Sequence, residues 1–422
     1  MTDSGIRRSV EAVWRIESAK IIAKLARMLR DVGLAEELAQ DALVAALEQW
    51  PRSGVPNNPG AWLMTTAKNR ALDQLRRFKL LQRKHPIIAQ EAELLVGESA
   101  AGDESPDDDV GDDLLRLIFI SCHPVLSTEA RVALTLRLLG GLTTAEIARA
   151  FLLPEPTIGQ RIVRAKRALT EAHVPFELPR NEQLAIRLAS VLEVIYLIFN
   201  EGYAATAGAE WMRPSLCEEA LRLGRILAEL APKEPEVHGL TALMEIQASR
   251  ASARIGPSGE PVLLMDQDRA RWDQLLIRRG LAALARAEGL GGALGPYALQ
   301  AAVAACHARA RTAQQTDWVR IVALYDALAQ LAPSPIVDLN RAVAISMAFG
   351  PVAALEIVDA LGRDSRLGNY HLLPSVRGDL LEKLGRFEEA RTEFARAAAL
   401  AQNDRERALL LGRAAACGTH IS

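Results

Sequence analysis

Apolar residues recur at helical spacing along most of the chain. Between residues 11 and 50 they return every three to five positions, and a polar break at Asp31–Gly33 predicts the end of one helix and the start of another. A loop rich in proline and asparagine follows at residues 51–60, and a long helical pattern covers residues 61–84. The same period runs through the remaining segments. The pattern therefore predicts an all-α protein.

A second compact helical pattern lies near the middle of the sequence. Thr143 and Glu146 have the T-x-x-E spacing of a capping box, which predicts a short helix over residues 144–151. A tight turn at residues 152–155 leads into a second helix that ends near residue 172. At 100° per residue this helix has one narrow apolar stripe, made of Ile158, Ile162, Ala165 and Leu169.

The opposite face of the second helix is polar and basic. It is either the solvated face of an ordinary surface helix or a face that lies on DNA. Two helices joined by a tight turn form a helix-turn-helix, whose second helix enters the major groove. Arginine reads guanine edges there, glutamine reads adenine edges, and further cations neutralise phosphates. The candidate DNA-reading residues are Thr157, Gln160, Arg161, Arg164 and Arg167.

The last 240 or so residues (176–422) carry a weak repeat. LAELAPKEPEV and LAQLAPSPIV resemble each other, and the period is about 34 residues. Small and aromatic residues in the last unit have tetratricopeptide spacing, namely Gly378, Gly385, Phe387, Ala390, Phe394 and Ala397. Each helix pair in such a repeat buries its apolar face only against its neighbours, so we expect a curved α-solenoid. Such a stack binds a partner in its groove or acts only as a brace.

The net charge of −2 conceals a segregation of charge along the chain. Residues 1–90 hold 15 Lys and Arg against 9 Asp and Glu, and residues 114–180 hold 9 against 5. Residues 91–113 hold 10 acidic residues and no Lys or Arg. This strap cannot bury enough apolar area to fold, so we expect a flexible linker between two basic modules, either a plain loop or a shield against nucleic acid.

The cysteines and histidines do not have the spacing of a catalytic or metal-binding motif. The 4 cysteines are far apart, and the 7 histidines offer no spaced pair on one helix. Phosphate loops and nucleophile elbows are missing, and the longest apolar run, VLEVIYLIF, is short and contains Glu193. We expect a cytoplasmic protein that is not an enzyme, uses no cofactor or metal and has no membrane segment.

Two stretches together resemble a known family. AEELAQDALVAALEQWP followed by NPGAWLMTTAKNRALDQLRR is similar to domain 2 of bacterial RNA polymerase sigma factors of the extracytoplasmic-function type (group IV). LLGGLTTAEIARAFLLPEPTIGQRIVRAKRAL is similar to domain 4 of the same family. The resemblance implies sigma domain 2 at residues 1–90, the acidic linker at 91–113, sigma domain 4 at 114–175 and a C-terminal helical, TPR-like regulatory domain at 176–422.

The resemblance also assigns roles to individual residues. One helix would bind the clamp helices of the polymerase core through Glu36, Glu37, Gln40, Asp41 and Leu43. A loop and the following helix would recognise the melted −10 element through Asn57, Asn58, Trp62, Lys68, Asn69, Arg70, Asp73, Arg76 and Arg77. The basic face of the helix-turn-helix would read the −35 element of duplex promoter DNA.

Three positions depart from the family pattern. Leu43 stands where an aromatic residue is frequent, LLPEP replaces a turn that often contains glycine, and Gly159 replaces a frequent lysine. These departures leave the individual promoter contacts open. The alternative to a sigma factor is a stand-alone helix-turn-helix transcription regulator with a TPR-like sensor, although such a regulator needs no second basic module.

The C-terminal extension is similar to that of a sigma-factor lineage in which a fused helical domain takes the place of a separate anti-sigma partner. Under that resemblance it would be an intramolecular regulator, of unspecified sign, that responds to a protein or a small molecule. Two stretches that break the repeat are either capped helix starts or surfaces that dock on the sigma domains. Their candidate residues are Asn200, Glu201, Tyr203, Asp266, Asp268, Arg269, Arg271 and Trp272.

Overall fold

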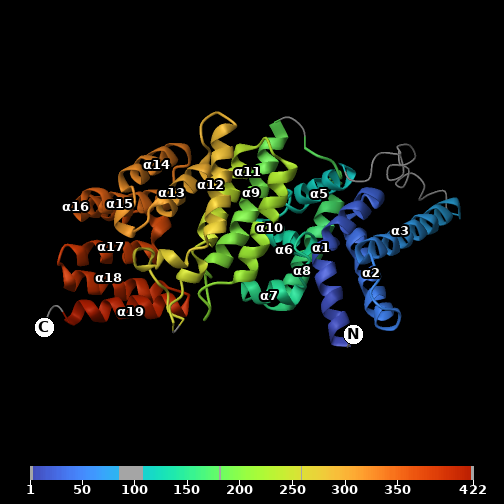
Figure 1. Cartoon of the computed structure of the whole chain (residues 1–422), viewed down its shortest axis with the longest axis horizontal. Coiled ribbons are helices and arrows are strands. Elements are labelled where there is room, and N and C mark those ends of the chain that lie inside the picture. The colour runs from blue at the N-terminus through green and yellow to red at the C-terminus, as the bar shows by residue number, and fades with distance from the viewer. Residues whose placement is uncertain (1–2, 85–107, 180–181, 258, 420–422) are drawn as a thin grey trace. The chain divides into compact units, whose positions relative to one another are not determined.

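The computed structural model describes residues 3–84, 108–179, 182–257 and 259–419, and these residues form helices joined by loops (Figure 1). Pairing of extended backbone within them is limited to isolated bridges, such as Gly208 with Asn403. The expected all-α class is confirmed. The chain divides into two compact units, Met1–Leu197 and Ile198–Ser422.

Three long helices form the first part of unit 1. They are α1 (Asp3–Leu29), α2 (Val32–Ser53) and α3 (Pro59–Lys84). The side chain of Asp31 accepts a hydrogen bond from the backbone N–H of Leu34, so the expected polar break is the N-cap of α2. The loop before α3 is shorter than expected, because α2 continues through Pro51 to Ser53.

Small residues allow these helices to approach closely. Ala35, Ala39, Ala42 and Ala46 form a fully buried row on α2. The core around this row contains larger side chains from all three helices, including Leu25 and Leu63, which are also fully buried. Burial of this apolar area stabilises the bundle by about 25 cal/mol per Å².

Shorter helices follow in the described residues 108–179: α5 (Asp108–Ser121), α6 (Thr128–Leu138), α7 (Thr144–Phe151) and α8 (Glu155–Glu171). The helix α5 corrects the expected linker of residues 91–113, because residues 108–113 already lie within it. The physical reason is Asp113, which is 1% exposed and pairs with Arg116 at 2.8 Å and with Arg27 at 3.5 Å. Residues 91–107 of that linker lie outside the described residues.

The helix α9 (Glu182–Tyr203) crosses the division between the two units. Its first part packs on α5 and α6, where Arg187 donates to the backbone carbonyl of Phe119 at 2.7 Å and Ser190 donates to that of Cys122 at 2.7 Å. Within the described residues, only Gln183–Tyr203 is long and apolar enough to cross a membrane. This is weak evidence for a span, because the core helix of a soluble protein has the same composition.

Unit 2 contains helix α10 and those that follow it. The first four are α10 (Pro214–Leu230), α11 (Pro235–Ala248), α12 (Gln274–Gly289) and α13 (Pro296–Arg309). The last six are α14 (Trp318–Leu331), α15 (Pro335–Phe349), α16 (Pro351–Leu361), α17 (Leu372–Lys383), α18 (Phe387–Leu400) and α19 (Asp404–Thr419). From α13 to α19 each helix packs on the next along the chain.

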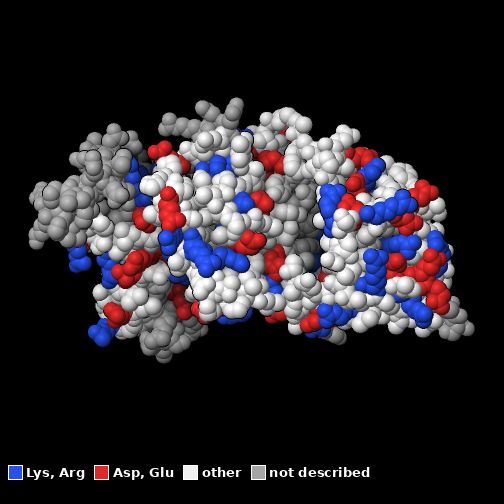
Figure 2. All heavy atoms as spheres, turned by 180° about the vertical axis from the view of Figure 1, so that it is seen from behind, with Lys and Arg blue, Asp and Glu red and all other residues white. Residues whose placement is uncertain are grey.

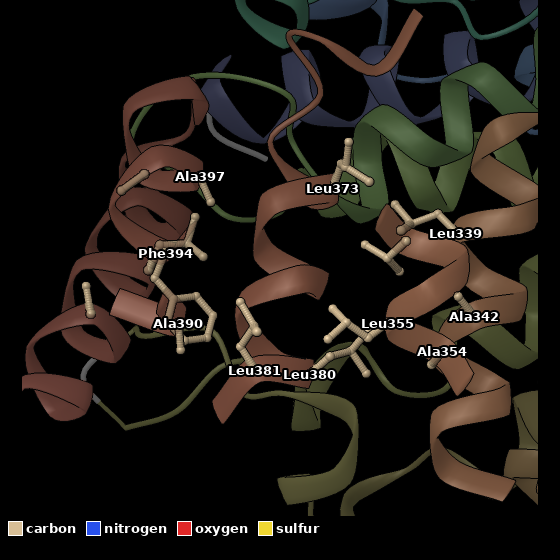
Figure 3. Packing of buried hydrophobic residues seen from close by; sticks show 14 of the residues in the cluster. Leu339, Ala342, Ala354, Leu355, Leu373, Leu380, Leu381, Ala390, Phe394 and Ala397 are labelled. Carbon is tan, nitrogen blue, oxygen red and sulfur yellow. The ribbon is translucent and has the colours of Figure 1, made fainter. Parts of the chain in front are cut away.

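A continuous apolar core joins α15 to α19 (Figure 3). Leu339, Leu355, Leu380 and Phe394 contribute to it from four different helices. Gly378 is required at its centre, because a Cβ atom there would lie 2.9 Å from the ring of Phe394. The core is therefore built from contacts between neighbouring helix pairs.

The surface of unit 2 carries charges of both signs. On the face drawn in Figure 2, Lys and Arg lie beside Asp and Glu at the end of the molecule that contains the C-terminal helices. Several of these charges form ion pairs between helices, such as Arg377 with Asp359 at 2.8 Å and Arg413 with Asp379 at 2.8 Å. Mixed charge of this kind lacks the single-sign field that binds nucleic acid.

Candidate nucleic-acid and polymerase interface

The helix α8 separates an apolar side from a polar side as the sequence predicts. Its expected stripe of Ile158, Ile162, Ala165 and Leu169 is buried, with each side chain at most 5% exposed. The apolar side packs on α6 and α7. Thr157, Gln160, Arg164 and Arg167 are exposed on the other side, whereas Arg161 is half-buried.

The turn before α8 is set by α7. Thr143 and Glu146 form the expected capping box, with the Thr143 hydroxyl accepting from the Glu146 backbone N–H at 3.1 Å and the Glu146 carboxylate accepting from the Thr143 backbone N–H at 2.8 Å. The chain then reverses at Leu152, whose φ of 52° lies in the left-handed region. Leu152 thus occupies the conformation that glycine adopts without strain.

Two of the candidate −35 residues have acidic neighbours. Arg167 Nε lies 2.6 Å from Glu171 Oε1 one turn along the helix, and this pairing raises the pKa of the Arg167 guanidinium. Glu129 has a lowered pKa, mainly because its carboxylate accepts a hydrogen bond from its own backbone N–H, and Arg161 adds to the effect. Arg167 is thus paired within α8, whereas Arg161 interacts with a carboxylate of α6.

Val163 was missed by the sequence analysis. It lies on the exposed side of α8 between Gln160 and Arg164, and it is 64% exposed. An apolar side chain on a major-groove helix contacts the thymine methyl group. The signal was present in the sequence, because Val163 lies outside the apolar stripe of α8.

The candidate −10 residues lie along α3 and the loop before it. Arg70 Nη1 is 3.1 Å from Asp41 Oδ2, and Arg76 Nη1 is 3.2 Å from Asp73 Oδ1. Among the other candidates on this helix, Asn69 and Arg77 are exposed and Lys68 is half-buried. The basic residues Lys79, Arg83 and Lys84 extend the same helix.

The loop before α3 is tied to the helix start. The Asn58 side chain accepts a hydrogen bond from the Ala61 backbone N–H at 3.0 Å, while Asn57 is exposed. Trp62 meets the buried Trp50 edge to face, with ring centroids 5.5 Å apart. The loop thus has one capping asparagine and one exposed asparagine beside a partly exposed indole.

The candidate core-binding residues lie on different sides of α2. Glu37 and Asp41 are exposed, Leu43 and Gln40 are half-buried, and Glu36 is only 3% exposed. The exposed side also carries Val44, which is 51% exposed, and Leu47, which is 39% exposed. The sequence analysis did not single out either residue. Neighbouring exposed apolar residues on one side of a helix can form part of a protein-binding surface.

Glu36 faces residues of α6 and α8. Arg137 Nε donates to Glu36 Oε1 at 2.6 Å, and Lys166 Nζ pairs with Glu36 Oε2. Gln40 also donates to Oε1 from the next turn of α2. Glu36 is therefore buried against α6 and α8, whereas Glu37 and Asp41 remain exposed on α2.

The interdomain docking candidates mostly have partners inside unit 2. Tyr203 stacks under the Arg254 guanidinium at 3.6 Å, and its hydroxyl accepts from Arg250 at 2.8 Å. Arg269 donates to the carbonyls of His307 and Ala310 and lies over the ring of Trp272, 4.8 Å from its centroid. These contacts join the end of α9 to the segment before α12.

The remaining candidates in this group have local roles or exposed positions. Glu201 pairs with Arg213, and Arg271 donates to the Ser252 carbonyl. Asp268 caps a short 3₁₀ helix through the Ala270 N–H, whereas the α12 cap is Asp273, not Asp266 or Asp268. Asn200 is half-buried and Asp266 is exposed.

No group that could hold a metal ion occurs among the described residues. The 4 cysteines are buried and unpaired. Burial raises the pKa of the Cys122 thiol to about 11, so it stays protonated at neutral pH. His123 beside it has its pKa lowered to about 4, by burial first and then by Arg187. At neutral pH Cys122 and His123 are therefore both uncharged, and neither belongs to a metal-binding group among the described residues.

Known families match three parts of the chain. Residues 17–79 match sigma-70 region 2, residues 116–169 match sigma-70 region 4, and residues 187–288 match a family of unknown function, DUF6596. Region 2 thus covers α2 and parts of α1 and α3, whereas region 4 covers the second part of α5, all of α6 and α7 and nearly all of α8. No solved structure matches the chain.

Individual relatives agree with this division. An uncharacterized protein of Rhizobium meliloti, R00370, is 46% identical over 97% of this chain and 95% of its own length. The ECF RNA polymerase sigma factor SigK of Mycobacterium ulcerans is 31% identical over 36% of this chain and 78% of its own length. The RNA polymerase sigma-H factor of Pseudomonas aeruginosa is 29% identical over 40% of this chain and 89% of its own length.

The shared segments are the ones that contain the basic helices α3 and α8 and the exposed acidic side of α2. The chain, which is not an enzyme, therefore belongs to the ECF RNA polymerase sigma factors, which direct transcription initiation by binding core polymerase and promoter DNA.

Proposed function

We propose that this sigma factor binds the clamp helices of core polymerase through the exposed side of α2. Glu37 and Asp41 supply charge there, and Val44 and Leu47 supply apolar contact area. Carboxylates beside exposed apolar residues suit a partner surface that is basic and partly apolar. Leu43 takes part from the half-buried edge of the same side.

The −10 element is bound by the loop before α3 and by α3 itself. Asn57 and Trp62 provide a polar group and a ring surface for an unstacked base, while Lys68, Asn69, Arg70, Arg76 and Arg77 follow the strand. Single-stranded DNA binds through cationic and stacking surfaces, and α3 carries basic residues beside the Trp62 ring. Asn58 holds the helix start in place for these contacts.

The −35 element is read by α8. Gln160, Val163 and Arg164 lie on the exposed side of its second and third turns, and the N-terminal part of the second helix meets base edges in a helix-turn-helix. Thr157 and Arg161 flank them, and Arg167 lies a turn further along. Gln160 suits adenine, Arg164 suits guanine and Val163 suits the thymine methyl group.

The C-terminal domain is a TPR-like solenoid that regulates the sigma domains in the cytoplasm. Three helix pairs begin at Trp318, Pro351 and Phe387, in agreement with a period of about 34 residues. Gly378 and Phe394 supply the small and aromatic packing positions of the last two pairs. A stack of this kind offers a groove for a protein or small-molecule regulator.

The observation that carries the regulatory proposal is the packing of α9. Arg131 lies 3.1 Å from Glu193, and Arg187 and Ser190 bond to carbonyls of the region 4 segment. The same helix ends at Tyr203, which is held by Arg250 and Arg254. A change in the contacts of Tyr203 with Arg250 and Arg254 would therefore act on the region 4 helices through α9 itself.

Run-off transcription with purified core polymerase tests the proposal. Full-length protein is compared with a chain that ends after Tyr203, because a shorter chain would lose the contacts of Arg187 and Ser190 with region 4. Specific initiation that changes in either direction on truncation supports regulation, and its direction gives the sign. Equal initiation by the two chains would refute regulation, and tight duplex binding without initiation by either would indicate a stand-alone regulator.

A further inference from the structure

Arginine side chains gather within unit 2 where the end of α9 meets the segments that follow α11. Arg254 is only 8% exposed, and Arg250 and Arg269 are half-buried. Burial lowers the pKa of the Arg254 and Arg269 guanidiniums, and the positive charge of Arg250 adds to the effect on both. Arginine still remains charged at neutral pH. These three residues, the arginine cluster, therefore hold like charges close together in a partly buried part of unit 2.

The arginine cluster has no ion-paired carboxylate within the part of the chain that the structure describes. Glu201 is paired with Arg213, and Glu406, which acts on Arg254 without an ion pair, lies 3.1 Å from His371 Nε2. A buried charge that has only neutral partners is costly, and an anion reduces that cost. The neutral groups to which the cluster donates are the hydroxyl and the carbonyl of Tyr203, the side chains of Gln247 and Thr316, and the carbonyls of His307 and Ala310.

Aromatic rings lie against the arginine cluster. Arg254 lies over the ring of Tyr203, 3.6 Å from its centroid. Arg250 and Arg269 lie 5.9 and 4.8 Å from the centroid of Trp272. The Nε atoms of these two arginines and the indole Nε1 of Trp272 are buried and have no hydrogen-bond partner among the described residues. All three are N–H donors, so the group that suits them carries acceptors only.

The burial of the arginine cluster decides which kind of anion it suits. A nucleic-acid backbone is neutralised by exposed basic side chains, whereas Arg254 and Trp272 are 8% and 4% exposed. The half-buried Arg250 and Arg269 leave access for a smaller group. An ionised carboxylate or phosphate group offers acceptors, and a guanidinium binds either one through two parallel N–H···O bonds. The oxyanion group of a small molecule therefore fits both the donors and their burial.

We propose that the arginine cluster binds the oxyanion group of a small molecule, either a phosphate or a carboxylate. Arg250 is the central residue, because it lies near both other guanidiniums and its Nε is unpartnered. The bound oxyanion joins the Tyr203 end of α9 to the segment that contains Trp272, since the cluster contacts both rings. The effect of this ligand on transcription rests on the proposed regulation through α9, whereas its binding does not.

Isothermal titration calorimetry of the full-length chain tests binding with two probes, inorganic phosphate and succinate, in a buffer whose other anion is chloride. We expect saturable binding of at least one probe to the wild-type protein, and the tighter of the two identifies the oxyanion. Arg250→Met removes the charge and the unpartnered N–H, so we expect binding at least about tenfold weaker. Arg341→Met is the matched control, because it loses the same charge in unit 2 but from a residue that pairs with Asp326 at 2.6 Å.

Three results would overturn the proposal. They are the lack of saturable binding of either probe to the wild-type protein, equal affinity of Arg250→Met and wild type, and an equal loss in the Arg341→Met control. Arg250→Gln keeps a donor for the Tyr203 hydroxyl, and its affinity is measured instead if circular dichroism shows that Arg250→Met is unfolded.

Run-off transcription with and without the bound probe separates this site from the proposed regulation. Saturable binding without a change in initiation confirms the site and refutes its regulatory role. A change in initiation on truncation, without binding of either probe, overturns the site and leaves the proposed regulation intact.

Discussion

Arg70 Nη1 lies 3.1 Å from Asp41 Oδ2, so the helix proposed to recognise the −10 element is ion-paired with the helix proposed to bind core polymerase. The pair is partly exposed, at 38% for Arg70 and 52% for Asp41. Pairs with this exposure contribute about 0.2–1 kcal/mol to stability. The pair therefore matters mainly for orientation. Under the proposed function, Asp41 would orient Arg70 until a DNA phosphate replaced the carboxylate as its partner.

Replacing Asp41 by Asn tests this relationship. We expect the free energy of unfolding to change by less than about 1 kcal/mol while initiation falls, because the variant alters both proposed surfaces. A double-mutant cycle with Arg70→Gln, measured by run-off transcription, separates the two contributions. Additive losses in the cycle would mean that the ion pair has no role in orienting Arg70.

The turn of the helix-turn-helix contains a second testable feature. Leu152 has φ 52° and is 54% exposed, so its side chain gains little burial in exchange for the strained backbone. Leu152→Gly should raise the free energy of unfolding by up to about 1 kcal/mol, since glycine adopts this conformation without strain. Thermal unfolding checks this, and Leu152→Ala serves as the control because it keeps the strain.

Local features of unit 1 could be predicted from the sequence, because they depend on neighbours three or four residues apart. The capping box at Thr143 and the buried stripe of α8 are of this kind. The burial of Glu36 could not be predicted, since it depends on Arg137 about a hundred residues away. The same holds for Asp113, which has the composition of a linker but lies against cations of α1.

The partners of the candidate docking residues in the C-terminal domain could not be predicted from the sequence either. The charges around Arg269 and Trp272 suggested a docking surface, yet Arg269 bonds to residues about 40 to 50 positions away, such as Thr316, and Arg271 bonds to Ser252. Sequence shows that such residues are unusual but does not show which partner satisfies them. Docking of Asp266 and Asp268 on the sigma domains stays a prediction.

Packing between the last helix pairs is sensitive to one methyl group. Gly378→Ala places a Cβ 2.9 Å from the Phe394 ring, so we expect a loss of about 1–3 kcal/mol in the free energy of unfolding. Gly412→Ala in α19 is the matched control, because nothing lies within 4 Å and the helix gains up to about 1 kcal/mol. Chemical denaturation of both variants measures the difference, and equal effects would exclude the tight Gly378 contact.

The buried His307 makes unit 2 sensitive to acid. Its pKa is lowered from 6.5 to about 4 by burial first, and then by Arg250 and Arg269. The unfolded chain takes up a proton below pH 6.5 while the folded chain does not, so stability that is present above pH 6.5 is lost as the pH falls toward 4. The loss is about 3 kcal/mol. His307→Gln should flatten the pH dependence of unfolding in this window, and an unchanged profile would contradict the shifted pKa.

The proposed promoter reading by α8 depends most directly on Arg164, which is exposed and lies in the third turn of the helix. Arg164→Ala should weaken binding of holoenzyme to its promoter by about 1–3 kcal/mol and relax the preference at one base pair, because a bidentate contact to guanine is lost. Arg167→Ala is the comparison, since Arg167 pairs with Glu171 and suits a phosphate contact. The loss of binding caused by Arg167→Ala should be equal across promoter sequences and should shrink as salt is raised.

Binding is measured against a set of single-base promoter variants at two salt concentrations. If Arg164→Ala behaves as Arg167→Ala does, Arg164 contacts only phosphate and the −35 sequence is read by Gln160 and Val163.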